Sequence, residues 1–158
     1  MSDPYLWLKW LHVVSATVLF GTGLGTALHM WLAHLRRDPR AIAVVARNVV
    51  LVDWLFTATS GVVQPLSGFG LVYLSAADPY ESWLVVSYLL YAVAALCWFR
   101  VVRLQARVRD FATAAVDSKT PLPPEYHRCM RAWFWLGWPA LVSLLGVFVL
   151  MVMRPSFW

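Results

Sequence analysis

Residues 132–153 read AWFWLGWPALVSLLGVFVLMVM, and this stretch decides the fold. It carries no charged side chain, and as a helix rising 1.5 Å per residue it crosses the roughly 30 Å of a bilayer's hydrocarbon core. Four apolar spans are expected, at about 5–34, 43–74, 82–103 and 131–153, and this stretch with Arg131 before it is the last of them. The sequence therefore predicts an all-α protein, an integral membrane four-helix bundle that occupies residues 1–158 as one domain.

The composition agrees with a membrane protein. The chain is 61% hydrophobic and 13% charged, whereas soluble domains carry about 25% charged residues. Only short connectors remain between the spans, so no separate extramembrane domain is expected. The net charge of +5 comes from basic residues beside apolar spans, without an aromatic-basic stripe or zinc-ligand spacing. A lipid bilayer is the expected partner, and a nucleic acid is not.

The distribution of basic residues predicts the orientation. Cytoplasmic connectors are rich in Lys and Arg, and two connectors hold eleven of the thirteen basic residues. These are Arg36, Arg37, Arg40 and Arg47 around the first connector, and Arg100, Arg103, Arg107, Arg109, Lys119, Arg128 and Arg131 around the third. Both termini are therefore expected outside, in a multi-pass protein of the bacterial inner membrane.

Polar residues of the first span share one face. At 100° per residue, His12, Ser15, Thr22, Thr26 and His29 fall within an arc of about 100°. Side chains of this kind lack partners in lipid, so the arc is expected to face the bundle. Ser and Thr often bond their own helix, but an intramembrane histidine such as His12 is a candidate functional residue.

One acidic residue, Asp53, lies inside a span. Helical rise places Asp53, His29 and Arg100 at a similar depth, about 10 Å inside the arginine-rich face. Because a buried carboxylate is costly unless it is paired, Asp53 is expected to form a buried polar network with His29 or Arg100. The sequence leaves open whether this is a structural ion pair or a proton route.

The motifs limit the chemistry. No Ser-His-Asp set, pair of catalytic carboxylates, phosphate-binding loop or HExxH motif occurs. A histidine in a small helical bundle is a common ligand of haem iron or copper, and Gly21, Gly23 and Gly25 leave space for a macrocycle. Met151 and Met153 end the fourth span on the same side as His12, and are candidates for a second ligand.

Two families are similar to this chain. Residues 5–14, YLWLKWLHVV, and the closing run from Arg131 to Pro155 resemble the two ends of HemJ-type protoporphyrinogen IX oxidases. The likeness to small bacterial predicted integral membrane proteins of unknown function, in the same HemJ and CopD-like grouping, covers nearly the whole chain. It includes the segments 20–26 (FGTGLGT), 53–57 (DWLFT) and 64–68 (QPLSG).

The resemblance to HemJ implies a four-helix membrane bundle that binds b-type haem, with His12 important for haem binding and activity. The chain departs from the HemJ pattern at two places. Ser87 falls near the position of a lysine in the third helix, and a Pro-Arg pair is replaced around Ala27 and Leu28. The resemblance therefore supports haem binding more strongly than it supports the oxidase reaction.

The expected function is that of a haem b-binding inner-membrane protein with an electron-transfer or porphyrin-related redox role. His12 is the expected metal ligand, with its second ring nitrogen bonded to a backbone carbonyl or to Ser15. The expected cofactor-binding residues are His12, Ser15, Gly23, His29, Met151 and Met153. A copper-handling protein, a cofactor-free structural subunit and a transporter are the alternatives. A redox partner, a quinone or a second copy of the chain are further possible partners.

Overall fold

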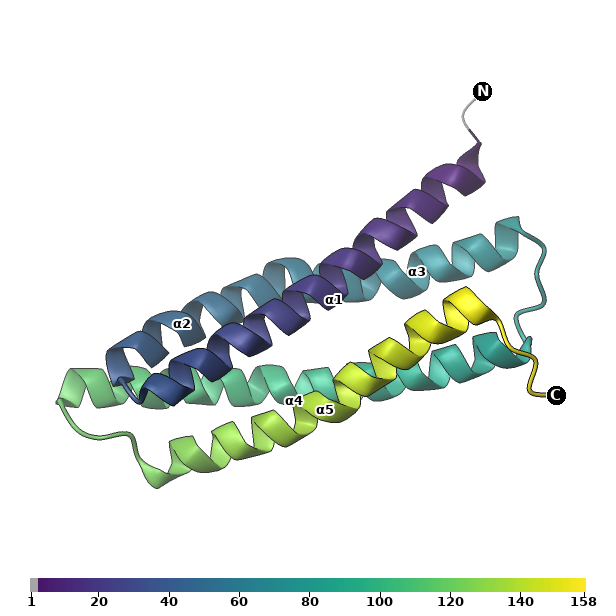
Figure 1. The fold of residues 1–158 in the computed structure, drawn as a ribbon. Coiled ribbons are helices and arrows are strands. Elements are labelled where there is room, and N and C mark those ends of the chain that lie inside the picture. The colour runs from purple at the N-terminus through teal and green to yellow at the C-terminus, as the bar shows by residue number, and fades with distance from the viewer. Residues whose placement is uncertain (1–2) are drawn as a thin grey trace.

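The structure is a computed structural model that describes residues 3–158, which form helices and short connectors and no strand. The first span is α1 (Pro4–Arg36), and the second is built from α2 (Pro39–Val52), the π-helix η1 (Asp53–Thr57) and α3 (Ala58–Leu74). The third and fourth spans are α4 (Ser82–Ser118) and α5 (Pro124–Met153). Figure 1 shows these four rods side by side, which confirms the predicted four-helix bundle.

Local sequence signals set the helix boundaries. Asp3 and Asp38 precede α1 and α2, and each carboxylate accepts a hydrogen bond from the backbone N–H two residues later. A proline follows each of them at the first helical position, where its missing N–H costs nothing. Arg37 and Lys119 end α1 and α4 in the left-handed conformation. The third and fourth helices extend beyond the expected limits of their spans, to Ser118 and from Pro124.

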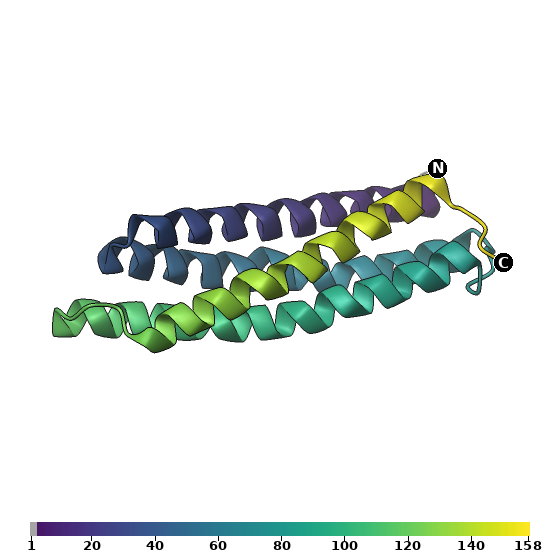
Figure 2. The same ribbon diagram turned by 60° about the horizontal axis from the view of Figure 1, so that its bottom comes forward.

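The helices pack unevenly. α4 packs mainly against α5 and α2, while α1 packs against α2, η1 and α3 and touches α5 only slightly. Figure 2 shows α5 running obliquely across the bundle. The largest buried cluster lies where α1, α2, α4 and α5 meet near the arginine-rich connectors. It consists of Met30, Ala33, Ile42, Ala43, Ala46, Val49, Val108, Ala112, Tyr126, Met130 and Trp133. The half of the bundle that holds the chain termini has fewer buried apolar residues.

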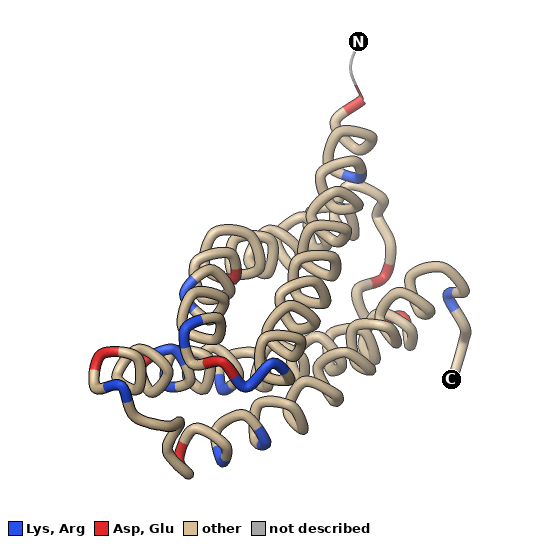
Figure 3. The backbone as a smooth tube through the Cα atoms, turned by 60° about the vertical axis from the view of Figure 1, so that its left-hand side comes forward, with Lys and Arg blue, Asp and Glu red and all other residues tan. Residues whose placement is uncertain are grey.

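The outside of the bundle is apolar. All four rods contain an 18-residue window that is long and hydrophobic enough to cross a membrane. The window in α1 is only 6% buried inside the protein, so lipid must cover most of it. Figure 3 shows Lys and Arg gathered at one end, called here the basic end, with both termini at the opposite, terminal end.

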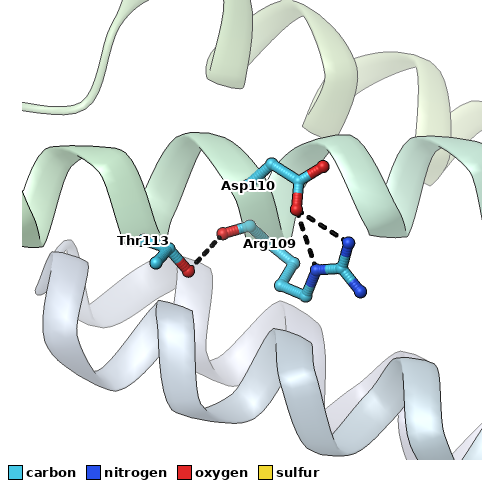
Figure 4. A network of polar contacts seen from close by, with 3 residues as sticks. All are labelled: Arg109, Asp110 and Thr113. Carbon is cyan, nitrogen blue, oxygen red and sulfur yellow. Dashed lines mark hydrogen bonds and ion pairs between the residues drawn. The ribbon is translucent and has the colours of Figure 1, made fainter.

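Beyond the apolar part of α4, charged side chains pair locally. The Arg109 guanidinium lies 2.8 Å from the Asp110 carboxylate, and the Thr113 hydroxyl donates to the Arg109 carbonyl (Figure 4). Such contacts within one helix turn are typical of a solvated helix surface and add little stability.

A proline in α3 creates a contact between helices. Pro65 has no N–H, so the carbonyl of Gly61, four residues earlier, loses its helical donor. The hydroxyl of Tyr91 on α4 donates to this carbonyl. A backbone group in hydrocarbon needs such a partner, because no water is available there. The bond joins α3 to α4 where these helices otherwise make few contacts.

Removal of the Tyr91 hydroxyl should therefore lower the stability of the protein by an amount that depends on whether Pro65 is present. We expect Tyr91→Phe to lower the free energy of unfolding in detergent by about 0.5–1.5 kcal/mol. In a Pro65→Ala background the helix regains its own N–H donor, so the same change should cost much less. Equal losses in both backgrounds would contradict this account.

The orientation can be tested with two isosteric cysteine variants. Ser75 and Ser118 are exposed at the terminal and basic ends, and each hydroxyl bonds only its own helix. In a background without Cys97 and Cys129, a membrane-impermeant maleimide should label Ser75→Cys on intact spheroplasts. Ser118→Cys should react only after permeabilisation. The reverse pattern would place the basic end outside.

Candidate functional site

His12 is held against α3 by one ring nitrogen. Its Nδ1 lies 2.8 Å from the Ser67 hydroxyl oxygen, and that hydroxyl donates in turn to the Val63 carbonyl at 2.7 Å. Because Ser67 has only one proton to give, its oxygen is left to accept from the Nδ1–H of His12. This arrangement favours the Nδ1–H tautomer of His12, in which the lone pair lies on Nε2.

Two glycines let α1 approach α3 at this place. A Cβ on Gly68 would lie 3.3 Å from Cε1 of His12, which is tighter than normal packing. A Cβ on Gly70 would lie 2.7 Å from Cδ2 of Leu8 and would force that side chain to move. The small residues of α3 thus allow the imidazole to lie flat against the helix.

Ser15 has a different role from the expected one. Its hydroxyl donates to the Gln64 side-chain oxygen at 2.6 Å and also lies 3.1 Å from the His12 carbonyl. The His12 ring therefore bonds Ser67 and the backbone of Gln64, and not Ser15. Sequence reasoning missed Ser67 and Gln64 as partners, although both lie in the segment 64–68 that carries part of the family resemblance.

A second polar cluster surrounds Asp53 at the start of η1. Asp53 is 3% exposed, and its Oδ1 accepts hydrogen bonds from the Thr26 and Thr57 hydroxyls, each at 3.0 Å. The amide side chain of Gln105 on α4 also lies against this carboxyl. The Thr22 hydroxyl is 3.1 Å from that of Thr57 and extends the cluster along α1.

The expected pairing of Asp53 with His29 or Arg100 does not occur. Both residues are exposed, and neither is bonded to Asp53 within the region that the structure describes. Depth along a helix does not fix the direction of a side chain, and on α4 it is Gln105, not Arg100, that points inward. On α1, the polar face is confirmed for His12, Ser15, Thr22 and Thr26, whose side chains contact the second span, but not for His29.

The remaining candidates lie away from His12. Met153 is 72% exposed and Met151 is partly exposed, and the first turns of α1 diverge from the end of α5 in Figure 1. Gly23 has no atom within 4 Å of a Cβ placed on it, so no neighbouring helix of the chain requires a glycine there.

A histidine that lies outside these clusters has a defined partner at the basic end. His34 Nδ1 lies 2.9 Å from the hydroxyl of Tyr126, a fully buried residue of α5. Beside them is a cavity of about 240 Å³, lined by Trp31, His34, His127, Met130, Arg131 and Phe134.

The fold and the lipid-facing surface define the class: the chain is a membrane-spanning protein of four helices. A family model described as a predicted integral membrane protein (DUF2269) matches residues 6–155. The chain belongs to this family, which confirms the expected membership in a family of membrane proteins of unknown function. No curated protein and no solved structure matches it.

The tautomer of His12 is directly measurable. In ¹⁵N-histidine-labelled protein, at a pH where imidazoles are neutral, we expect NMR to find the proton of His12 on Nδ1. Ser67→Ala should shift His12 toward the Nε2–H form, because the acceptor has gone. Ser60→Ala, at another buried serine of α3, is the matched control and should change nothing. An Nε2–H form in the parent would refute the assignment.

Proposed function

We propose that this protein binds haem b through His12 in the bacterial inner membrane and has an electron-transfer or porphyrin-related redox role. The observation that carries the proposal is the hydrogen bond between His12 Nδ1 and Ser67, which orients an intramembrane imidazole and favours the tautomer with its lone pair on Nε2. A neutral imidazole whose other nitrogen is hydrogen-bonded is the usual form of an axial haem ligand.

The neighbouring residues fit a ligand role for His12. Ser67 orients the ring, and Gly68 leaves room for it against α3. Ser15 and Gln64 tie α1 to α3 one turn away, so the ring is held between helices that are themselves joined. A bound haem would supply one-electron transfer, while the chain supplies one fixed nitrogen donor and a largely apolar surrounding.

The likeness to HemJ supports haem binding, and Ser87 favours electron transfer over the oxidase reaction. Ser87 is 2% exposed, and its hydroxyl donates to the Trp83 carbonyl of its own helix. It cannot replace the charge of the lysine found near this position in HemJ proteins. We therefore propose that the porphyrin is a resident cofactor rather than a substrate.

Copper is the less favoured cofactor. A copper site of the expected kind needs sulfur ligands beside the imidazole, and Met153 is largely exposed at the end of α5. A haem would need only the nitrogen that His12 offers.

The test is a reduced-minus-oxidised absorption spectrum of protein purified from cells with ample haem supply. We expect a b-type spectrum in the parent, its loss in His12→Ala, and its retention in His29→Ala. His29 is a matched control because it lies on the same helix but is exposed. A parent without haem, or a His12→Ala variant with a full spectrum, would refute the proposal.

A further inference from the structure

We propose that Asp53 is a proton-binding site: a carboxylic acid that stays neutral among uncharged hydrogen-bonding side chains. This inference does not rest on haem binding. The two sites are separate. His12 belongs to the first and Thr26 contacts Asp53 in the second, and these two residues are about 21 Å apart along α1.

Burial is the first argument. Asp53 is buried, whereas the other seven acidic residues of the chain are exposed. A lone carboxylate in hydrocarbon is strongly disfavoured and must be paired or neutralised. The Asp53 carboxyl therefore needs a positive charge beside it or a proton on it.

No cation faces Asp53 from the elements packed around it. The charged or titratable groups at this level are His29 on α1, Arg47 on α2, and Arg100 and Arg103 on α4, and all of them are exposed. On α3 the only titratable side chain is that of Tyr73, which is 85% exposed near the terminal end. The side chains that do contact the carboxyl, those of Thr26, Thr57 and Gln105, are all neutral.

The hydrogen bonds indicate which atoms share the proton. Both threonine hydroxyls are directed at Oδ1 of Asp53, which leaves Oδ2 free of them. Gln105 is 2% exposed, and its Oε1 has no hydrogen-bond partner although it is buried. As placed, Gln105 contacts the carboxyl through its amide N–H. An unsatisfied buried oxygen is costly, and a half-turn of the amide group would bring this oxygen to the carboxyl in place of the N–H. With a proton on Oδ2, the turned amide accepts it at Oε1, so protonation removes the charge and satisfies the amide oxygen together.

The backbone of η1 holds this geometry. In a π-helix the chain makes wider turns, and here Asp53 and Thr57, four residues apart, are both buried on one side. Thr57 therefore donates to Asp53 from within the same turn, while Thr26 donates from α1. Two donors on Oδ1 polarise the carboxyl but supply no net charge, so the proton is still needed.

Infrared spectroscopy of the purified full chain tests the proposal. At neutral pH we expect a carboxylic-acid C=O band that shifts with ¹³C-labelled aspartate and in D₂O and is absent in Asp53→Asn. The seven exposed carboxyls should contribute only carboxylate bands. In Gln105→Leu the band should remain but move, because the acceptor is gone. A parent without an acid band, or a band that survives in Asp53→Asn, would overturn the proposal.

Thermal unfolding in detergent separates a proton from a metal cation. Asp53→Asn keeps the shape and hydrogen bonds of a neutral acid, so its Tm should stay within about 2 °C of the parent, whereas Asp53→Ala should unfold several degrees lower. The Tm should be the same in sodium and in N-methylglucamine buffers. Stabilisation of the parent by sodium that is lost in Asp53→Asn would overturn the proposal in favour of a bound cation.

Discussion

Hydrocarbon offers no hydrogen-bond partners, and this constraint governs the polar contacts in the apolar part of the bundle. The polar side chains of α1 bond the second span: His12 bonds Ser67, Ser15 bonds Gln64, Thr22 meets Thr57, and Thr26 bonds Asp53. These contacts follow one face of the middle part of α1, from His12 to Thr26. They therefore fix how α1 is rotated about its own axis relative to the second span. Apolar packing alone would specify this rotation poorly, because lipid tails pack against a helix as well as side chains do.

The second span has two irregularities, Pro65 and η1, and both are associated with hydrogen bonds between buried groups. Pro65 frees a carbonyl that Tyr91 satisfies from α4, and η1 turns Asp53 and Thr57 to the same buried side. A regular helix would satisfy its own backbone and would offer α4 no such carbonyl. The second span therefore contacts α1 through side chains and α4 partly through its backbone, and it forms the link between the two hairpins of the bundle.

Much of this was predictable from sequence, for reasons that differ between features. Uncharged runs such as 132–153 predict four spans, because spanning depends on length and hydropathy alone. The inward face of α1 followed from the helical period, which placed His12, Ser15, Thr22 and Thr26 correctly. The partners of Asp53 did not follow, because depth along an axis says nothing of direction, and Arg100 turned outward while Gln105 turned inward. The π-helix left no distinct pattern in the segment DWLFT, although the spacing of Thr57 four residues after Asp53 was a usable signal for their contact.

The uneven packing bears on where the proposed cofactor would fit. At the basic end, alanines and large side chains from four helices form a close-packed cluster beside the cavity at His34, and a macrocycle placed within that cluster would have to displace it. At the terminal end the buried side chains are mainly serines, and α1 and α5 barely touch. Opening that end costs less burial of apolar surface, so it is the end at which a large planar ligand can enter with the basic end intact. His12 is the one imidazole in the terminal half of the bundle, so the proposed ligand role for it is compatible with the stability of the bundle as a whole.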